Sequence, residues 1–203
     1  CDFFAPARHI TLLPIMSNQN TAGWVMRLDV SGSQLWYRTY TQGISTGFGD
    51  IQATEAGTFM VVGNVVPLDG LGRVSVTHLD ADGNILWQKS YATDEVNLSS
   101  EIYQTSTGDF MITNENDTHI RLLKINPDGD ILWQNSYAKR FSSSNWGFYS
   151  KVQVIEASNG DVIVAGDRIY RDDFTGFDAF IMKLDENGEV TPCQWIEPIS
   201  TVI

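Results

Sequence analysis

One sequence pattern occurs four times in this chain, and it constrains the fold more than any other feature. It reads LDVSGSQLWYRTY at 28–40, LDADGNILWQKSY at 79–91, INPDGDILWQNSY at 125–137 and LDENGEVTPCQWI at 184–196. The glycines at its centre, Gly32, Gly83, Gly129 and Gly188, are 51, 46 and 59 residues apart. A period near fifty residues is typical of β-propellers and related β arrays. The repeat therefore predicts an architecture, and it says nothing about activity.

Each copy of the pattern has the grammar of a β-hairpin. In the second copy, a stretch with period-two alternation leads into Asp-Ala-Asp-Gly-Asn and then into a second alternating stretch that includes Trp87 and Tyr91. Glycine supplies the positive φ that a tight turn requires, and the aspartate before it hydrogen-bonds its own backbone. The DG and NG sites are therefore predicted to be hairpin turns.

A second strand pair precedes each of the last three hairpins, so each full unit is predicted to contain four antiparallel strands. The segments 50–66, 101–117 and 151–169 each combine a half-buried strand, a turn centred on glycine and a more apolar strand. The predicted strands of these units are 50–55, 58–65, 74–80 and 85–91; 101–106, 109–114, 119–125 and 131–137; and 151–157, 161–166, 178–184 and 189–196.

The predicted fold class is all-β, a propeller with four blades in a single domain over residues 1–203. Radial repetition of four-stranded units protects strand edges that would otherwise aggregate. The repeats run over about 1–49, 50–100, 101–150 and 151–203, and the first is one strand short, with only 9–16, 22–29 and 34–40. The tail ISTVI at 199–203 would supply the missing strand and close the ring. The alternative is an open slice of a larger propeller.

The combination of an apolar strand, LDxxGxxLWxxxY and xGxFxxxG resembles the repeats of secreted bacterial β-propeller proteins and, more distantly, those of quinoprotein-type propellers. It covers nearly the whole chain. The fourth repeat departs from the pattern, with Pro192 and Cys193 where Trp87 and Gln88 stand in the second. Terminal repeats are often atypical. The resemblance implies a propeller fold, and a quinone-dependent activity is its enzymatic implication.

Two repeated features have structural interpretations. Trp36, Trp87 and Trp133 occupy one equivalent position, and a large aromatic side chain at that spacing predicts packing between adjacent repeats. The string from Asp80 to Asn84 resembles part of a calcium loop, but Ile85 and Trp87 follow where further ligands would be needed. We therefore expect hairpin turns there and no cofactor; a more acidic stretch, Asp167, Asp172, Asp173 and Asp178, is the alternative calcium candidate.

The composition narrows the classes of partner. The 25 acidic and 13 basic residues give a net charge of −12, which opposes binding to nucleic acid and to anionic membranes. The sequence contains no apolar run near the length of a membrane-spanning helix. Three interpretations of Cys1 stay open: an accident of where the sequence starts, the lipid-bearing residue of a bacterial lipoprotein, and a disulfide with Cys193 in an oxidising compartment.

Catalytic motifs are scarce in the sequence. His9, His78 and His119 fall inside predicted strands, and no zinc spacing, serine nucleophile motif or phosphate-binding glycine loop is present. The prediction is therefore a protein that is not an enzyme. Carboxylate pairs that converge from different repeats would leave open a glycan hydrolase, which is the enzymatic alternative beside the quinone-dependent dehydrogenase.

Alternation along the chain separates short, repeated turns from connections of variable length. The variable set is 41–50, 67–73, 93–100, 139–150 and 168–178, and such loops commonly carry function. Two of them are rich in aromatic side chains, which together with arginines suit a protein or glycan contact. The predicted binding residues are Phe141, Trp146, Phe148, Tyr149, Arg168, Tyr170, Arg171 and Phe174. The alternative is that the aromatic residues fold back to cover the edge of the ring.

These observations favour a binding or structural module outside the cytoplasm, on the surface of a bacterium or secreted by it. Its predicted partners are proteins, glycans or copies of itself. A third alternative is a subunit of an extracellular filament or surface array, in which the tail ISTVI adds a strand to a neighbouring molecule.

Overall fold

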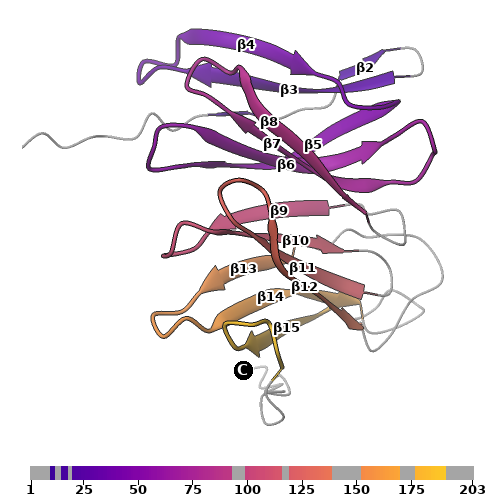
Figure 1. The fold of residues 1–203 in the computed structure, drawn as a ribbon, viewed down its shortest axis with the longest axis vertical. Helices are drawn as coiled ribbons and strands as arrows, with labels where there is room; N and C mark the ends of the chain where they lie inside the picture. The colour runs from indigo at the N-terminus through magenta and orange to yellow at the C-terminus, as the bar shows by residue number, and fades with distance from the viewer. Residues whose placement is uncertain are drawn as a thin grey trace, which may run out of the picture. The chain divides into compact units, whose positions relative to one another are not determined.

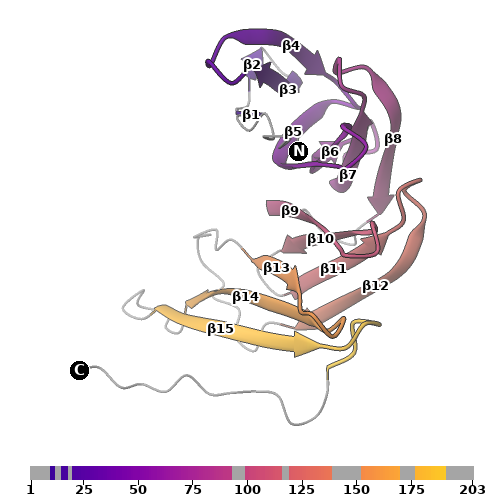
Figure 2. The ribbon, with the colours of Figure 1, turned by 90° about the vertical axis from the view of Figure 1, so that its left-hand side faces the viewer.

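The computed structural model describes residues 10–11, 15–17, 20–92, 99–115, 119–138, 152–169 and 177–190. All regular elements in this part are β-strands, which confirms the predicted all-β class (Figures 1 and 2). The chain divides into two compact units, a first unit of residues 1–96 and a second unit of residues 97–203.

The first unit is built on a strand meander. Strands β5 to β8 pair in sequence order and antiparallel, and β3 pairs with β1, β2 and β4 (Figure 2). One parallel pair, Thr21 with Ser45, joins β3 to β5. The strands are β1 Ile10–Thr11, β2 Ile15–Ser17, β3 Asn20–Leu28, β4 Gln34–Tyr40, β5 Ser45–Ala53, β6 Phe59–Val66, β7 Arg73–Leu79 and β8 Ile85–Ala92.

The second unit contains two sheets of the same kind. One is a four-stranded meander in the order β12-β11-β10-β9, and the other is formed by β13, β14 and β15, all antiparallel (Figure 2). A single bridge from Leu184 to Val190 extends the second sheet. The strands are β9 Ser99–Gln104, β10 Phe110–Glu115, β11 His119–Ile125, β12 Ile131–Ala138, β13 Gln153–Glu156, β14 Val162–Ile169 and β15 Phe177–Leu184.

The hairpin turns share one backbone geometry. In the turn at 80–84, the amide of Asp80 donates to the carbonyl of Asn84 at 2.9 Å, and the amide of Gly83 donates to the carbonyl of Asp80 at 3.1 Å. Gly83 has a φ of 78°, a conformation that glycine adopts without steric cost. The same two bonds close the turns at 29–33, 54–58, 105–109, 126–130, 157–161 and 185–189.

The hydrophobic cores lie between successive sheets of each unit. In the first unit, Val25 and Tyr40 pack with Phe59, Val61 and Leu79, so the β3–β4 hairpin covers one face of the β5–β8 meander. In the second unit the core joins the β9–β12 sheet to the β13–β15 sheet, through Met111, Ile120, Leu122, Val152, Val154, Val162, Val164, Met182 and Leu184. The central strands β6 and β10 are buried along nearly their whole length, and in β10 the buried residues include the polar Thr113, Asn114 and Glu115.

Most predicted strands lie within a few residues of their observed bounds, and three of them differ in extent or in pairing. Strand β5 begins at Ser45 instead of 50, because a bulge at Phe48 and Asp50 lets the glycine-rich segment continue the pairing with β6. Strand β14 continues to Ile169, paired with Phe177. Of the predicted strand 9–16, the described residues are 10–11 in β1 and 15–16 in β2, and both strands pair with β3.

Closure of the ring, unlike the fold class, stays a prediction. No sheet among the described residues closes on itself, and the predicted strand 189–196 and the tail 199–203 lie outside them, apart from residues 189 and 190. The propeller, its blade count and its single domain stay predictions. Across the described ranges, no helix has the length and apolar character needed to span a membrane.

The close approach of β5 to β6 makes a testable demand on Gly63. A Cβ added there would lie 2.7 Å from the Cα of Phe48, a backbone contact that a rotamer change does not relieve. We expect Gly63→Ala to lower the free energy of unfolding by about 1–3 kcal/mol, as overpacking does. Gly47→Ala is the matched control, because no atom lies within 4 Å of its added Cβ. Equal urea midpoints for the two variants would show that β5 does not approach β6 in this way.

Candidate functional site

The repeated aspartates cap their own turns. The carboxylate of Asp80 accepts the amides of Asp82 at 2.9 Å and Asn84 at 2.8 Å, and it also accepts the side-chain amide of Asn84 at 2.8 Å. These bonds, first the one from the Asn84 side chain, lower the pKa of Asp80 from its ordinary value. The carboxylate is thus engaged as a turn cap, which fits the interpretation of this string as a hairpin turn.

The carbonyls of the same turn receive a row of side chains from the preceding hairpin. Trp36 Nε1 donates to Ala81 O at 3.0 Å, Arg38 Nε to Asp82 O at 2.8 Å, and Tyr40 Oη to Gly83 O at 2.8 Å. The three donors alternate along one face of β4, so they reach three successive carbonyls. We call such a row a ladder, and the turn that accepts it a receiving turn.

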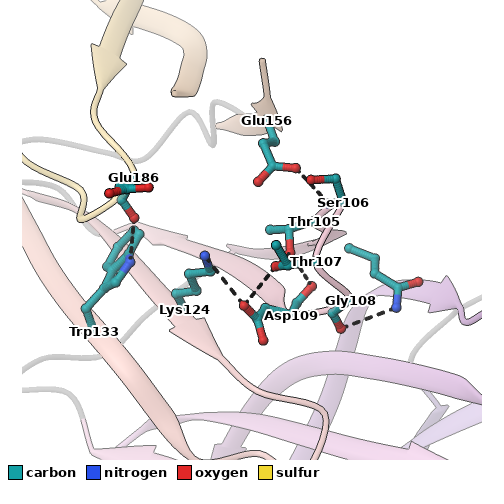
Figure 3. A network of polar contacts seen from close by, with 10 residues as sticks. Thr105, Ser106, Thr107, Gly108, Asp109, Lys124, Trp133, Glu156 and Glu186 are labelled. Carbon is teal, nitrogen blue, oxygen red and sulfur yellow. Dashed lines mark hydrogen bonds and ion pairs between the residues drawn. The ribbon is translucent and has the colours of Figure 1, made fainter. Parts of the chain in front are cut away.

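The second unit repeats this arrangement with different side chains. Trp133 Nε1 donates to Glu186 O at 3.1 Å, and Asn135 Nδ2 donates to Asn187 O at 3.2 Å and to Gly188 O at 3.0 Å. Tyr137 Oη also donates to Gly188 O. Trp133 and Glu186 are seen together in Figure 3. A tryptophan, a long polar side chain and a tyrosine at alternate positions therefore form the common element.

The ladder also explains the glycine of the receiving turn. A Cβ at Gly83 would lie 3.0 Å from the ring of Trp36, and a Cβ at Gly188 would lie 2.9 Å from the ring of Trp133. Both glycines are buried. Glycine is needed there for its positive φ and also for the close approach of an indole ring.

The contacts of Trp87 differ from those of Trp36 and Trp133. Its ring lies 5.5 Å from the ring of His78, edge to face, and 5.7 Å from the ammonium group of Lys89. In the described part of the chain its buried Nε1 has no hydrogen-bond partner.

In the last three repeats, the residue five positions before the glycine ties the third strand of a sheet to the end of its first turn. His78 Nε2 lies 2.8 Å from Thr58 Oγ1, Lys124 Nζ lies 3.6 Å from the carboxylate of Asp109, and Lys183 pairs with Asp161. Neighbouring sheets are linked as well, since the amide of Ser106 donates to Glu156 at 2.7 Å (Figure 3). We call the edge of each sheet that carries these turns the turn edge; its polar groups are used in holding the repeats together.

The opposite edge of each sheet, which we call the loop edge, differs in character. Its described connection between β6 and β7, residues 67–72, is ordered by a turn at Gly70 and by an ion pair of Arg73 with Asp69. Leu68 is 88% exposed and Leu71 is 64% exposed. Two apolar side chains are thus held in solvent by a structured loop, which was predicted only as a variable connection.

The predicted binding residues fall almost entirely outside the described residues. Arg168 is the exception: its backbone lies in strand β14, paired with Asp178, so it does not belong to a loop as predicted. Pairing of β14 with β15 over eight positions explains the difference, because it extends the hairpin into the expected loop. The residues outside the description are Phe141, Trp146, Phe148, Tyr149, Tyr170, Arg171 and Phe174, together with Cys1 and Cys193.

The acidic stretch that was the alternative metal candidate falls partly within the described residues. Asp167 and Asp178 of the acidic stretch lie in strands β14 and β15, and Asp172 and Asp173 lie outside the description. Among the described residues, no three His, Cys, Asp or Glu side chains are grouped so that they would hold a metal ion.

Two carboxylates are buried in the second unit. Glu101 is 9% exposed and Glu115 is 6% exposed, and the pairing of β9 with β10 places them at diagonal positions on one face of the sheet. Thr113, between them on that face, donates to Val152 O at 3.0 Å. Buried carboxylates need polar partners, and both glutamates have interactions. A pair of carboxyl groups is also what a glycan hydrolase requires.

Sequence reasoning missed the polar half of the ladder. It treated the repeated tryptophans as packing residues alone, although donors recur four, six and eight positions after the glycine. The signal was present as Trp36, Arg38 and Tyr40 and as Trp133, Asn135 and Tyr137. The hydrogen bonds are seen only when the last strand of a repeat, β4 or β12, is placed against the next turn, where the tips of these side chains meet the carbonyls.

Comparison with known proteins gives a distant likeness in structure. No family model and no curated protein matches the sequence. A protein of unknown function from Dyadobacter fermentans is 14% identical, with a TM-score of 0.52 over 89% of this chain and 52% of that one. At that identity, the likeness concerns the fold alone.

Two further solved structures are less similar. The Pan2 WD40 domain from Neurospora crassa is 12% identical, with a TM-score of 0.48 over 88% of this chain and 50% of that one. A mutant apocarotenoid oxygenase from Synechocystis is 10% identical, with a TM-score of 0.47 over 87% and 45%. The chain therefore spans about half the length of the structures it resembles, and the TM-scores of these two are too low to carry an argument.

The indole hydrogen bond of the first ladder can be measured by substitution. Trp36→Phe keeps an aromatic ring near Phe59 but removes the indole donor to Ala81 O and leaves only the bond from Arg27 Nη1, and we expect it to cost about 1 kcal/mol of unfolding free energy. Trp36→Ala should cost about 3 kcal/mol, because the ring is lost as well. Leu35→Ala, at an exposed position of the same strand, is the control. If Trp36→Phe unfolds at the wild-type urea concentration, the bond contributes nothing.

The ladder tyrosines predict a loss of stability at high pH. Burial raises the pKa of Tyr40 and of Tyr137 to about 12, above the value near 10 of tyrosine in an unfolded chain. Between those values the folded protein keeps two protons that the unfolded chain loses. The stabilisation is therefore complete below about pH 10 and disappears as the pH rises towards 12.

The double variant Tyr40→Phe, Tyr137→Phe should lose less stability than the wild type between about pH 9 and about pH 11.5 in urea unfolding. Tyr37→Phe, an exposed tyrosine of β4, is the control and should follow the wild type. Identical pH dependence of the double variant and the wild type would contradict the burial of these hydroxyl groups.

Proposed function

We propose that this protein is a propeller module that binds a protein or glycan partner through its loop edge and that it has no catalytic function. The observation that carries the proposal is the contrast between the two edges. On the turn edge, the described polar groups are hydrogen-bonded within and between repeats. On the loop edge, the connection at 67–72 presents Leu68 and Leu71 together to solvent, whereas the turn 29–33 of the turn edge exposes Val30 alone.

Physical reasons favour the loop edge as the contact surface. Single exposed apolar residues are common on proteins, but two leucines in one ordered loop give a contact surface that loses little entropy on binding. The connections predicted at 139–150 and 168–178, the second shortened to 170–176 by strands β14 and β15, belong to the same set and contribute aromatic residues, which are typical anchors of interfaces. Protein and glycan ligands both use such anchors, and self-assembly is the homotypic form of the same contact.

A location outside the cytoplasm accompanies this proposal as a prediction. It rests on the acidic composition and on the resemblance to secreted propeller repeats. Mass spectrometry of the native protein tests it, since it detects both a lipid on Cys1 and a bridge from Cys1 to Cys193.

The loop edge can be tested with two sets of substitutions. We expect Leu68→Ser with Leu71→Ser, and separately Trp146→Ala with Phe174→Ala, to reduce self-association or glycan binding at least tenfold, as the loss of interface anchors does. Sedimentation velocity and a panel of immobilised glycans are the measurements. Leu86→Ala, at an exposed position of strand β8, is the control and should bind normally.

Thermal unfolding must accompany these measurements. If Trp146→Ala with Phe174→Ala unfolds the protein, the aromatic residues cover the core, and the binding role of their loops is wrong. If all variants keep the wild-type sedimentation and glycan binding, the loop edge is not the contact surface for either.

A further inference from the structure

The first hairpin differs from the other three in burial. Gly83, Gly129 and Gly188 are buried, whereas Gly32 is exposed. Burial also differs at the apolar residue four positions before the glycine. Leu28 is only half-buried, whereas its equivalents Leu79, Ile125 and Leu184 are at most 1% exposed. The same difference in burial is found six positions before the glycine. Met26 is half-buried, whereas its equivalents Thr77, Leu123 and Met182 are buried.

The backbone of the first turn is nevertheless that of a receiving turn. The amide of Asp29 donates to Ser33 O at 2.9 Å, and the amide of Gly32 donates to Asp29 O at 3.0 Å. Gly32 has a φ of 83°, and Asp29 caps the amides of Ser31 at 2.8 Å and Ser33 at 2.9 Å. The carbonyls of residues 30–32 are therefore in the positions that accept a ladder in the turns 80–84 and 185–189.

The space above this turn is open. A Cβ at Gly32 would meet no atom within 4 Å, whereas one at Gly83 or Gly188 would meet a tryptophan ring. Among the described residues no hydrogen bond ends on the carbonyl of Val30, Ser31 or Gly32, because the bonds of the turn end on Asp29 and on Ser33. We call the surface formed by Met26, Leu28 and the turn 29–33 the first face.

We propose that the first face is a docking site for the edge strand of a further repeat of this same type, supplied from outside the four repeats of this sequence. The strand would carry tryptophan, a basic or amide side chain, and tyrosine at alternate positions. Its indole Nε1, its polar side chain and its hydroxyl group would donate to the carbonyls of residues 30–32, and its sheet would cover Met26 and Leu28.

The four repeats of the chain do not offer this strand themselves. In the fourth repeat the ladder positions hold Pro192, Gln194 and Ile196, so the tryptophan and tyrosine donors are missing. The ladders that begin at Trp36 and Trp133 already occupy receiving turns. In the remaining ladder, Lys89 and Tyr91 are not free. A second copy of the chain would bring ladders that are engaged apart from the Trp87 indole, which is why we assign the docked strand to a different repeat.

Charge agrees with this choice of partner. The middle residue of two of the ladders is basic, Arg38 and Lys89, and the chain has a net charge of −12. A basic side chain placed above the carboxylate of Asp29 would be stabilised by attraction to that carboxylate as well as by the hydrogen bond to the turn carbonyl.

A synthetic peptide with the sequence of residues 84–92, NILWQKSYA, is the probe. We expect it to bind the isotopically labelled protein saturably in an NMR titration, with the largest shift at the amide of Gly32. Gly32→Asn should weaken binding at least tenfold, because asparagine accepts a positive φ but places a side chain where the indole ring would lie.

Gly57→Asn is the matched control, since Gly57 has a φ of 76° in a turn of the same geometry, with no atom within 4 Å of an added Cβ. It should bind the peptide as the wild type does. A further test changes the peptide and keeps the wild-type protein. Phenylalanine in place of the tryptophan or of the tyrosine of the peptide should weaken binding several-fold.

Three results would overturn the proposal. The first is no saturable shift up to millimolar peptide, and the second is unchanged affinity in Gly32→Asn. The third is self-association of the chain that Gly32→Asn abolishes in sedimentation velocity, which would make a second copy the occupant. The test is independent of the loop edge, because Leu68→Ser with Leu71→Ser should leave peptide binding unchanged.

Discussion

The structure depends on the way in which turn carbonyls are satisfied. Each receiving turn is closed by the amide of its first residue, by its glycine amide and by its aspartate. Three carbonyls of the turn are left, and they point away from the paired strands. Carbonyls that become buried need donors. Within each unit the donors come from the edge strand of the preceding repeat, with Trp36 and Trp133 as the first rung. One set of contacts therefore satisfies the turn, buries the glycine and fixes how one sheet packs on the next.

This arrangement explains why the repeat conserves its pattern while its chemistry varies. The middle rung is Arg38 in one ladder and Asn135 in the other, and both donate to the turn carbonyls. Similarly, His78 with Thr58 takes the place that ion pairs of lysine with aspartate take in the second unit. What is required at these sites is a donor of the right length, so a histidine inside a strand is explained without a catalytic role.

The sequence predicted the hairpins well because both of their determinants are local. The positive φ of glycine, the aspartate cap and alternation along a strand are all set within about ten residues. It predicted less well where pairing with a distant strand decides the outcome. Strand β5 includes Ser45 because Val66 pairs with it, and β14 includes Arg168 because Asp178 does. The contact of Trp36 with Ala81 spans 45 residues, so local pattern showed the tryptophan but not its partner.

Donation in one direction gives the array a polarity. In both units a repeat donates its ladder to the turn of the repeat that follows it in the chain, from β4 to the turn at 80–84 and from β12 to the turn at 185–189. A repeat therefore has a donating side and a receiving side that are chemically different. The first repeat has the backbone geometry of a receiving turn at Gly32, whereas the fourth repeat has Pro192 and Ile196 in place of the tryptophan and tyrosine donors. An association of this chain end to end with itself would lack the donors, and this asymmetry favours a different repeat as the neighbour of the first face.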